Sequence, residues 1–130
     1  MEIKVELLNA DKIMKFLETR PERTKEELNK AIADYTTAIA INQKLDKAYG
    51  NRGIAYLNKR EFNKAIADCT KAIALNSQFF PGMVVLGRIY MEKGEKEKAK
   101  YWYKKSLKRK DKLPDKGDRV IKWLKELESK

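Results

Sequence analysis

The chain repeats itself every 34 residues, which limits it to architectures in which similar units stack on one another. Residues 27–42 read ELNKAIADYTTAIAIN and residues 61–76 read EFNKAIADCTKAIALN, so that twelve of the sixteen aligned positions are identical. The same offset continues into a third copy, where Ala99 corresponds to Ala65. Chance does not produce this agreement, and the copies are expected to share one local structure.

Each copy carries apolar residues three and four positions apart, as at Ala65, Cys69 and Ala72. This spacing places them on one face of a helix. A second helical pattern, which includes Gly53, precedes it, and a short turn separates the two. Each unit is therefore predicted to be a helix–turn–helix hairpin in which Gly53 lets the first helix approach the small residues of the second. In the next unit Gly94 suits the left-handed conformation that ends a helix.

The period and the spacing of Gly53, Tyr56, Ala65 and Ala72 resemble those of the tetratricopeptide repeat family. The resemblance implies an all-α protein, a right-handed superhelix of stacked helical hairpins with a C-terminal capping helix. Phe79-Phe80-Pro81 fits the start of a helix, with the proline in the first turn. We expect a single domain over residues 1–130, with an irregular N-terminal segment at 1–23, the second helix of a degenerate first repeat at 24–45, complete repeats at 46–79 and 80–113, and a capping helix at 114–130.

The chain before the first complete repeat departs from this pattern, because Pro21 would break a helix there. Residues 11–19 are predicted to form a short helix that covers the first hairpin. Its apolar residues are Ile13, Met14, Phe16 and Leu17. Thr24 is predicted to open the next helix, with Glu27 completing a capping box. Residues 2–8 alternate like a strand that has no partner strand, and are interpreted as an arm.

Apolar residues recur at helical spacing after Pro114 and predict a terminal helix, with Asp115 and Asp118 as candidate caps. Such a helix would cover the last exposed apolar surface of a repeat array. Mostly helical segments, and no sheet, are predicted over residues 24–42, 46–59, 62–76, 80–93, 96–110 and 118–129.

The composition excludes several classes of chemistry. The chain has no histidine and one cysteine, Cys69, which removes histidine-based catalysis and an intrachain disulfide. Cys69 takes the place of a core tyrosine of the other copies and is predicted to be buried. No apolar run of membrane-spanning length occurs, and the start lacks the features of a secretory signal. We therefore expect a soluble, cytoplasmic protein that is not an enzyme and has no cofactor, no bound metal and no membrane partner.

The resemblance implies that the first helices of the hairpins line a concave groove. The residues predicted to face this groove are Lys47, Asn51, Ile54, Asn58, Val84, Arg88 and Met91, together with Val85 and Glu92. A mixture of apolar and polar side chains suits a peptide groove, because apolar pockets supply affinity and polar groups fix the register. The leading hypothesis is a scaffold that binds a peptide or partner segment there. The alternative is that Ile54, Val84 and Met91 pack beneath the N-terminal helix or the arm.

Some relatives bind acidic chaperone tails through a cluster of lysine, asparagine and arginine. Asn51 stands at the matching asparagine position, but Pro81 and Val85 stand where the next unit should supply lysine and arginine. In the preceding unit the expected lysine and asparagine fall on Phe16 and Arg20. The sequence therefore predicts that such tails bind poorly.

The C-terminal third is strongly basic, since residues 93–130 carry 15 Lys and Arg against 7 Asp and Glu, out of a net charge of +11 for the chain. The candidate basic patch consists of Lys100, Lys104, Lys105, Lys108 and Arg109. Tyr101 and Trp102 interrupt it, which allows an alternative function in binding a polyanion or nucleic acid. We expect such binding to be weak and salt-sensitive, because a charge run is more often a solvated face. A self-associating assembly module is the third hypothesis, and the oligomeric state stays open.

Overall fold

The computed structural model describes residues 9–19 and 22–129, in which helices joined by short turns are the regular structure and no strand occurs. The elements are α1 (Ala10–Thr19), α2 (Lys25–Ile41), α3 (Asp46–Asn58), α4 (Phe62–Leu75), α5 (Phe80–Lys93), α6 (Lys96–Leu107), the 3₁₀ helices η1 (Lys110–Lys112) and η2 (Pro114–Gly117), and α7 (Asp118–Glu128). The interpretation of residues 2–8 as an arm lies outside the described residues.

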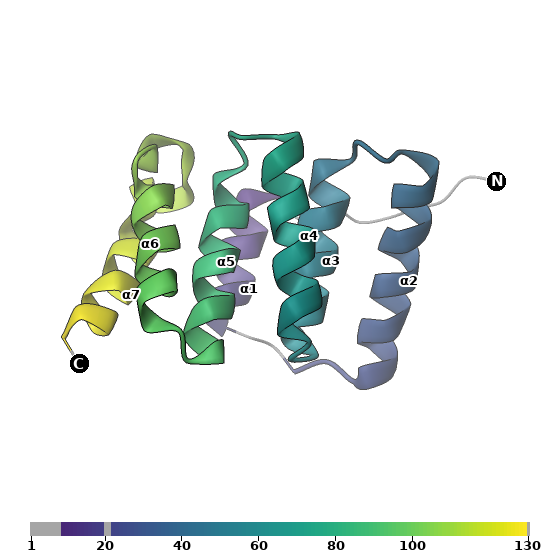
Figure 1. The fold of residues 1–130 in the computed structure, drawn as a ribbon, viewed down its shortest axis with the longest axis horizontal. Coiled ribbons are helices and arrows are strands. Elements are labelled where there is room, and N and C mark those ends of the chain that lie inside the picture. The colour runs from purple at the N-terminus through teal and green to yellow at the C-terminus, as the bar shows by residue number, and fades with distance from the viewer. Residues whose placement is uncertain (1–8, 20–21, 130) are drawn as a thin grey trace.

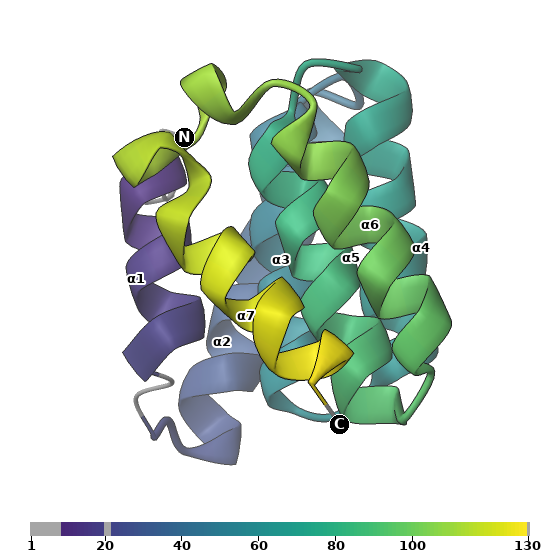
Figure 2. The same cartoon turned by 90° about the vertical axis from the view of Figure 1, so that its left-hand side faces the viewer.

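Helices α2 to α6 stack side by side and alternate in direction (Figure 1). Figure 2 shows α3 and α5 as an inner layer and α4 and α6 as an outer layer. On the far side of the inner layer lies α1, which packs against α5 and η2, and α7 packs against α6 at the end of the stack. The all-helical fold with a terminal capping helix is as the repeat pattern predicted.

The two hairpin turns show how the same geometry is reached with different residues. After α5, Gly94 takes a φ of 87°, and the Glu95 N–H donates to the Tyr90 carbonyl over 2.8 Å. After α3, Arg60 takes the corresponding position with a φ of 63°. The left-handed conformation satisfies carbonyl groups at the helix end, and glycine adopts it without a side-chain clash. The predicted role of Gly94 is confirmed.

The helix ends in the C-terminal third differ from the prediction. Helix α6 ends at Leu107 instead of continuing to residue 110, because Arg109 leaves the helical region with φ −127° and ψ 54°. The prediction that Asp115 or Asp118 caps the last helix was wrong. Gly117 is the capping residue, with a φ of 78° and no side-chain hydrogen bond, while the Asp115 carboxylate pairs with Arg119 at 3.0 Å. The predicted capping box between Thr24 and Glu27 is present.

Close contact between the two helices of a hairpin explains why small residues recur. A Cβ atom added at Gly53 would lie 2.7 Å from the Cys69 sulfur and 3.3 Å from the Ala65 carbonyl oxygen. Ala65, Cys69 and Ala72 are all fully buried on the facing side of α4. Since a side chain at position 53 would meet backbone as well as sulfur, the crossing of α3 and α4 requires glycine there.

We expect Gly53→Leu to lower the free energy of unfolding by at least about 1–3 kcal/mol, because it overpacks this crossing. Lys47→Leu on the same helix is the control, since Lys47 is exposed and its replacement should change stability by no more than about 0.5 kcal/mol. Urea denaturation followed by circular dichroism measures both. Equal stability of the two variants would contradict the close crossing.

Tyr103 on α6 is the largest fully buried side chain among the described residues and packs beside Trp123 of α7, with ring centroids 6.2 Å apart. Burial raises the pKa of its hydroxyl to about 12. The pKa of a tyrosine in an unfolded chain is about 10, so the folded state holds this proton more tightly. Tyr103 therefore contributes stability below about pH 10 that is lost as the pH rises toward about 12.

Tyr103→Phe should remove this part of the pH dependence. Between about pH 10 and 12 the free energy of unfolding of the variant should fall less steeply than that of the unaltered chain. Tyr101→Phe, two positions earlier on the same helix but exposed, should follow the unaltered chain. Urea titrations at several alkaline pH values decide the matter, and identical slopes for all three proteins would refute the assignment.

Candidate partner-binding face

The inner surface of α5 is covered along most of its length. Its residues 80–87 are all buried, as is Ile89, which is more than one face of a helix can bury against a single neighbour. Helices α4 and α6 cover two sides, and α3 also contacts α5. The remaining, inner side is covered by α1 (Figure 2).

Helix α1 has the pattern of an amphipathic segment. Ile13, Met14 and Leu17 are at most 1% exposed and Phe16 is 8% exposed, whereas its charged residues face solvent. Apolar positions three and four apart give one buried stripe, and Asn9 caps the first turn by accepting from the Lys12 N–H over 2.9 Å. The four apolar side chains belong to the same core cluster as Ile54 and Val84.

The structure places the predicted groove residues in three environments. Asn51, Ile54, Val84 and Val85 are buried, with at most 4% of each exposed. Asn58, Arg88, Met91 and Glu92 are partly buried, and Lys47 is exposed. The set is therefore not one open surface. Ile54 and Val84 share a core cluster with the apolar residues of α1, and Met91 packs against that cluster, which agrees with the alternative interpretation that these three residues pack beneath the N-terminal helix.

Two predicted groove residues make contacts within the protein. The Asn51 amide donates to the Lys47 carbonyl over 2.6 Å, one turn earlier on α3. The Arg88 guanidinium lies over the Trp123 ring, 4.5 Å from its centroid, and so links α5 to α7. Such a cation–π contact contributes about 0.5–2 kcal/mol depending on desolvation. Both residues therefore have structural roles.

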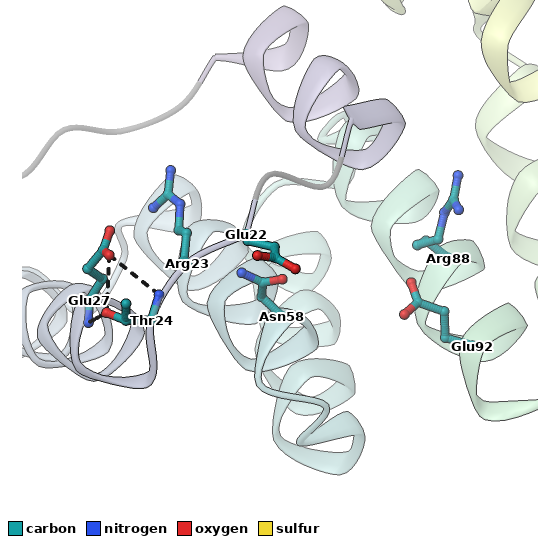
Figure 3. Close-up of a pocket in the computed structure, with 7 residues that line it drawn as sticks. All are labelled: Glu22, Arg23, Thr24, Glu27, Asn58, Arg88 and Glu92. Atoms are coloured by element: carbon teal, nitrogen blue, oxygen red, sulfur yellow. Dashed lines mark hydrogen bonds between the residues drawn. The ribbon is translucent and has the colours of Figure 1, made fainter.

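An open depression of about 760 Å³ continues the inner face beyond the end of α1 (Figure 3). It is lined by Glu22, Arg23, Thr24, Glu27, Asn58, Arg88 and Glu92. The first four were not predicted, since they precede the complete repeats and their place beside α3 and α5 depends on how the chain enters α2. Charges of both signs meet there, which suits a peptide with a mixed polar sequence.

The positions that would form the chaperone-tail cluster are apolar and enclosed. Pro81 and Val85 lie in the buried part of α5, and Phe16 lies in the buried stripe of α1. Arg20 lies outside the described residues. Because Asn51 is also buried, the four of these positions that the structure describes offer no converging donors to a carboxylate.

Most of the candidate basic patch on α6 and beyond is paired. Lys100 lies 3.4 Å from Glu97, Lys104 lies 3.9 Å from Glu128, and Arg109 lies 3.3 Å from Asp111. Lys105 lies over the rings of Tyr101 and Trp102, at 5.7 and 5.3 Å from their centroids, and Lys108 is exposed. Exposed pairs of this kind contribute little to stability, but they lower the charge presented to a polyanion.

The predicted burial of Cys69 is confirmed, since its side chain is fully buried and burial raises the pKa of the thiol. Within residues 9–19 and 22–129, no group of three potential metal-ligating side chains of the His, Cys, Asp and Glu types is found. In the same part of the chain, no helix is both long and apolar enough to cross a membrane.

We expect Asn51→Ala to lower the free energy of unfolding by about 1 kcal/mol, because it removes a buried hydrogen bond. Asn58→Ala is the matched control: it alters the same helix two turns later, where the side chain is partly exposed, and should cost no more than about 0.5 kcal/mol. Chemical denaturation of both variants measures the difference. A stability loss confined to Asn58→Ala would show that Asn51 has no structural role.

Comparison with known proteins gives the family. Profiles of the tetratricopeptide repeat match residues 46–79 and 81–112. A search of curated proteins gave no significant match. Similar solved structures include the second such domain of human RPAP3 with an HSP70 peptide (TM-score 0.70, 23% identity, covering 92% of each chain). Another is the TPR2B domain of yeast Sti1, with a TM-score of 0.73 and 20% identity over 92% of this chain and 96% of that one. The Yersinia enterocolitica type III secretion translocator chaperone SycD has a TM-score of 0.73 and 10% identity over 93% of this chain and 86% of that one. The profile matches span just over half of the chain, which therefore belongs to the tetratricopeptide repeat family.

Proposed function

We propose that this protein is an interaction adaptor that holds a peptide or partner segment against the inner face formed by α3 and α5. The observation that carries the proposal is that a ten-residue amphipathic helix, α1, packs against α5 on this face and shares a core cluster with Ile54 of α3. A surface that buries four apolar side chains of one helix has the shape and chemistry to hold a peptide. The mixed-charge depression lined by Asn58 and Arg88 extends this face and supplies polar contacts that fix register.

The solved relatives support a peptide partner of some kind. The human RPAP3 domain is in complex with an HSP70 peptide, and the yeast Sti1 domain is in complex with pHsp70. For this chain we propose a different class of segment, because Pro81 and Val85 are buried and carry no charge. A partner here would gain its affinity from apolar contacts instead of from a cluster of cations around a carboxylate.

Site-specific photo-crosslinking tests the proposal. A benzophenone amino acid placed at Asn58, on the inner face, should yield a defined adduct from native lysate. The same residue at Lys71, exposed on the outer helix α4, should not. Both positions tolerate a large side chain because neither belongs to the buried core. Adducts formed only at Lys71, or equally at both positions, would contradict binding on the inner face.

A further inference from the structure

We propose that the inner face is a receptor for an amphipathic helix carrying acidic residues in its first turn, and that α1 is a resident competitor which such a helix displaces. This inference rests on the proposed adaptor function and specifies its partner.

The position of α1 is the first argument. In sequence α1 stands about one period before α3, where the first helix of a hairpin would pack on α2. Its main contacts are instead with α5 and η2. The consequence is visible on α2: Ala31 and Tyr35 are partly exposed, whereas the corresponding Ala65 and Cys69 are fully buried beneath α3. Helix α1 therefore occupies the inner face as an added segment and not as part of the repeat stack.

The attachment of α1 is the second argument. A ten-residue helix is marginal in water by itself, so α1 is helical because it is docked. Its apolar stripe supplies the contact area, and Glu18 pairs with Arg119 at 3.1 Å, with the Glu18 side chain 52% exposed. An exposed pair of this kind adds little. Any segment that presents a similar stripe can therefore make the same contacts.

The charges around α1 define the partner further. The start of α1 borders a cavity of about 470 Å³ lined by Asn9, Ala10, Lys47, Gln78, Phe79, Pro81 and Lys112. Two lysines thus lie beside the first turn of the docked helix, where acidic residues also interact favourably with the helix dipole. In its first turn α1 supplies only Asp11. A partner helix with further acids there, and one opposite Arg119, complements this face better than α1 does.

The covalent link between α1 and the inner face determines how strongly α1 competes with a partner helix. Since α1 belongs to the same chain, it competes at an effective concentration on the order of millimolar. The apparent affinity for a partner is therefore its intrinsic affinity multiplied by the fraction of molecules in which α1 is undocked. Weakening the docking of α1 should raise the affinity for an added helix, which is the opposite of what loss of a purely structural contact would do.

Fluorescence anisotropy tests this with full-length protein and two labelled probes. One probe is the peptide of residues 9–19, and the other is the same peptide with Ala10→Glu. Leu17→Asp in the protein removes a side chain of α1 that is 1% exposed, and should increase the affinity for both probes at least about tenfold over the unaltered chain. The Ala10→Glu probe should bind about two- to fivefold more tightly than the other at low salt, because of Lys47, Lys112 and the helix dipole.

Charge reversal provides a milder variant that leaves the core intact. Glu18→Arg in the protein sets like charges beside Arg119 and should raise probe affinity by about two- to fivefold. With Arg119→Glu in the protein, a probe carrying Glu18→Arg should bind more tightly than the unaltered probe. If α1 only supported the fold, changing the charge at position 119 of the protein would not change which of the two probes binds more tightly.

Hydrogen exchange gives an independent measurement. Saturating the unaltered protein with the Ala10→Glu probe should expose the amides of α1 in the protein while those of α3 and α5 stay protected. Affinity that does not change in a folded Leu17→Asp protein would overturn the inference. If circular dichroism shows that the Leu17→Asp protein is unfolded, the Glu18→Arg protein is used instead. A probe affinity that does not rise in the Glu18→Arg protein would also overturn the inference. Crosslinking at Asn58 that persists in either case would leave the adaptor function standing without displacement of α1.

Discussion

Close approach of the two helices within each hairpin is the constraint on which this structure depends. Gly53 lies against Cys69, and Gly87 lies against the Tyr103 ring, which a Cβ atom at Gly87 would approach to 2.5 Å. The contact fixes how α3 crosses α4 and how α5 crosses α6, and repetition of one crossing generates the stack. The layered arrangement and the inner face both follow from this local fit.

A stack of repeats has to cover apolar surface that no further repeat buries. At the C-terminal side α7 does this with Val120, Trp123 and Leu127, and Arg88 joins it to α5 through the Trp123 ring. On the inner face α1 packs against α5, and its apolar side chains share one core cluster with Ile54 and Val84. Both helices are amphipathic and lie outside the 34-residue period. The segments that complete the core are therefore those whose packing position no repeated copy in the sequence indicates.

The repeat pattern was sufficient to predict the helices, because spacing at Ala65, Cys69 and Ala72 reports a local periodicity. The capping box of Thr24 and Glu27 could also be predicted from the sequence, since its residues and contacts lie within one helical turn. The cap of α7 could not be predicted in this way. Gly117 begins the helix through its left-handed backbone conformation, whereas Asp115 was expected to cap it with a side-chain hydrogen bond. The residues predicted to face the groove lie on α3 and α5, but the burial of Asn51, Ile54 and Val84 was not predicted, because it depends on where α1 docks and no internal copy of the repeat contains α1. Their contact with a partner stays a prediction.

The pairing of Glu18 with Arg119 joins segments that are far apart along the chain. During synthesis the N-terminal part of a chain emerges first, at about 5–20 residues per second. Hairpins close by local contacts as soon as they are made, whereas long-range contacts form late. Helix α1 therefore has no surface to pack against until α5 and the segment before α7 have been produced. Its apolar stripe stays uncovered throughout that interval, so the inner face is completed only after the helices that α1 packs against have formed.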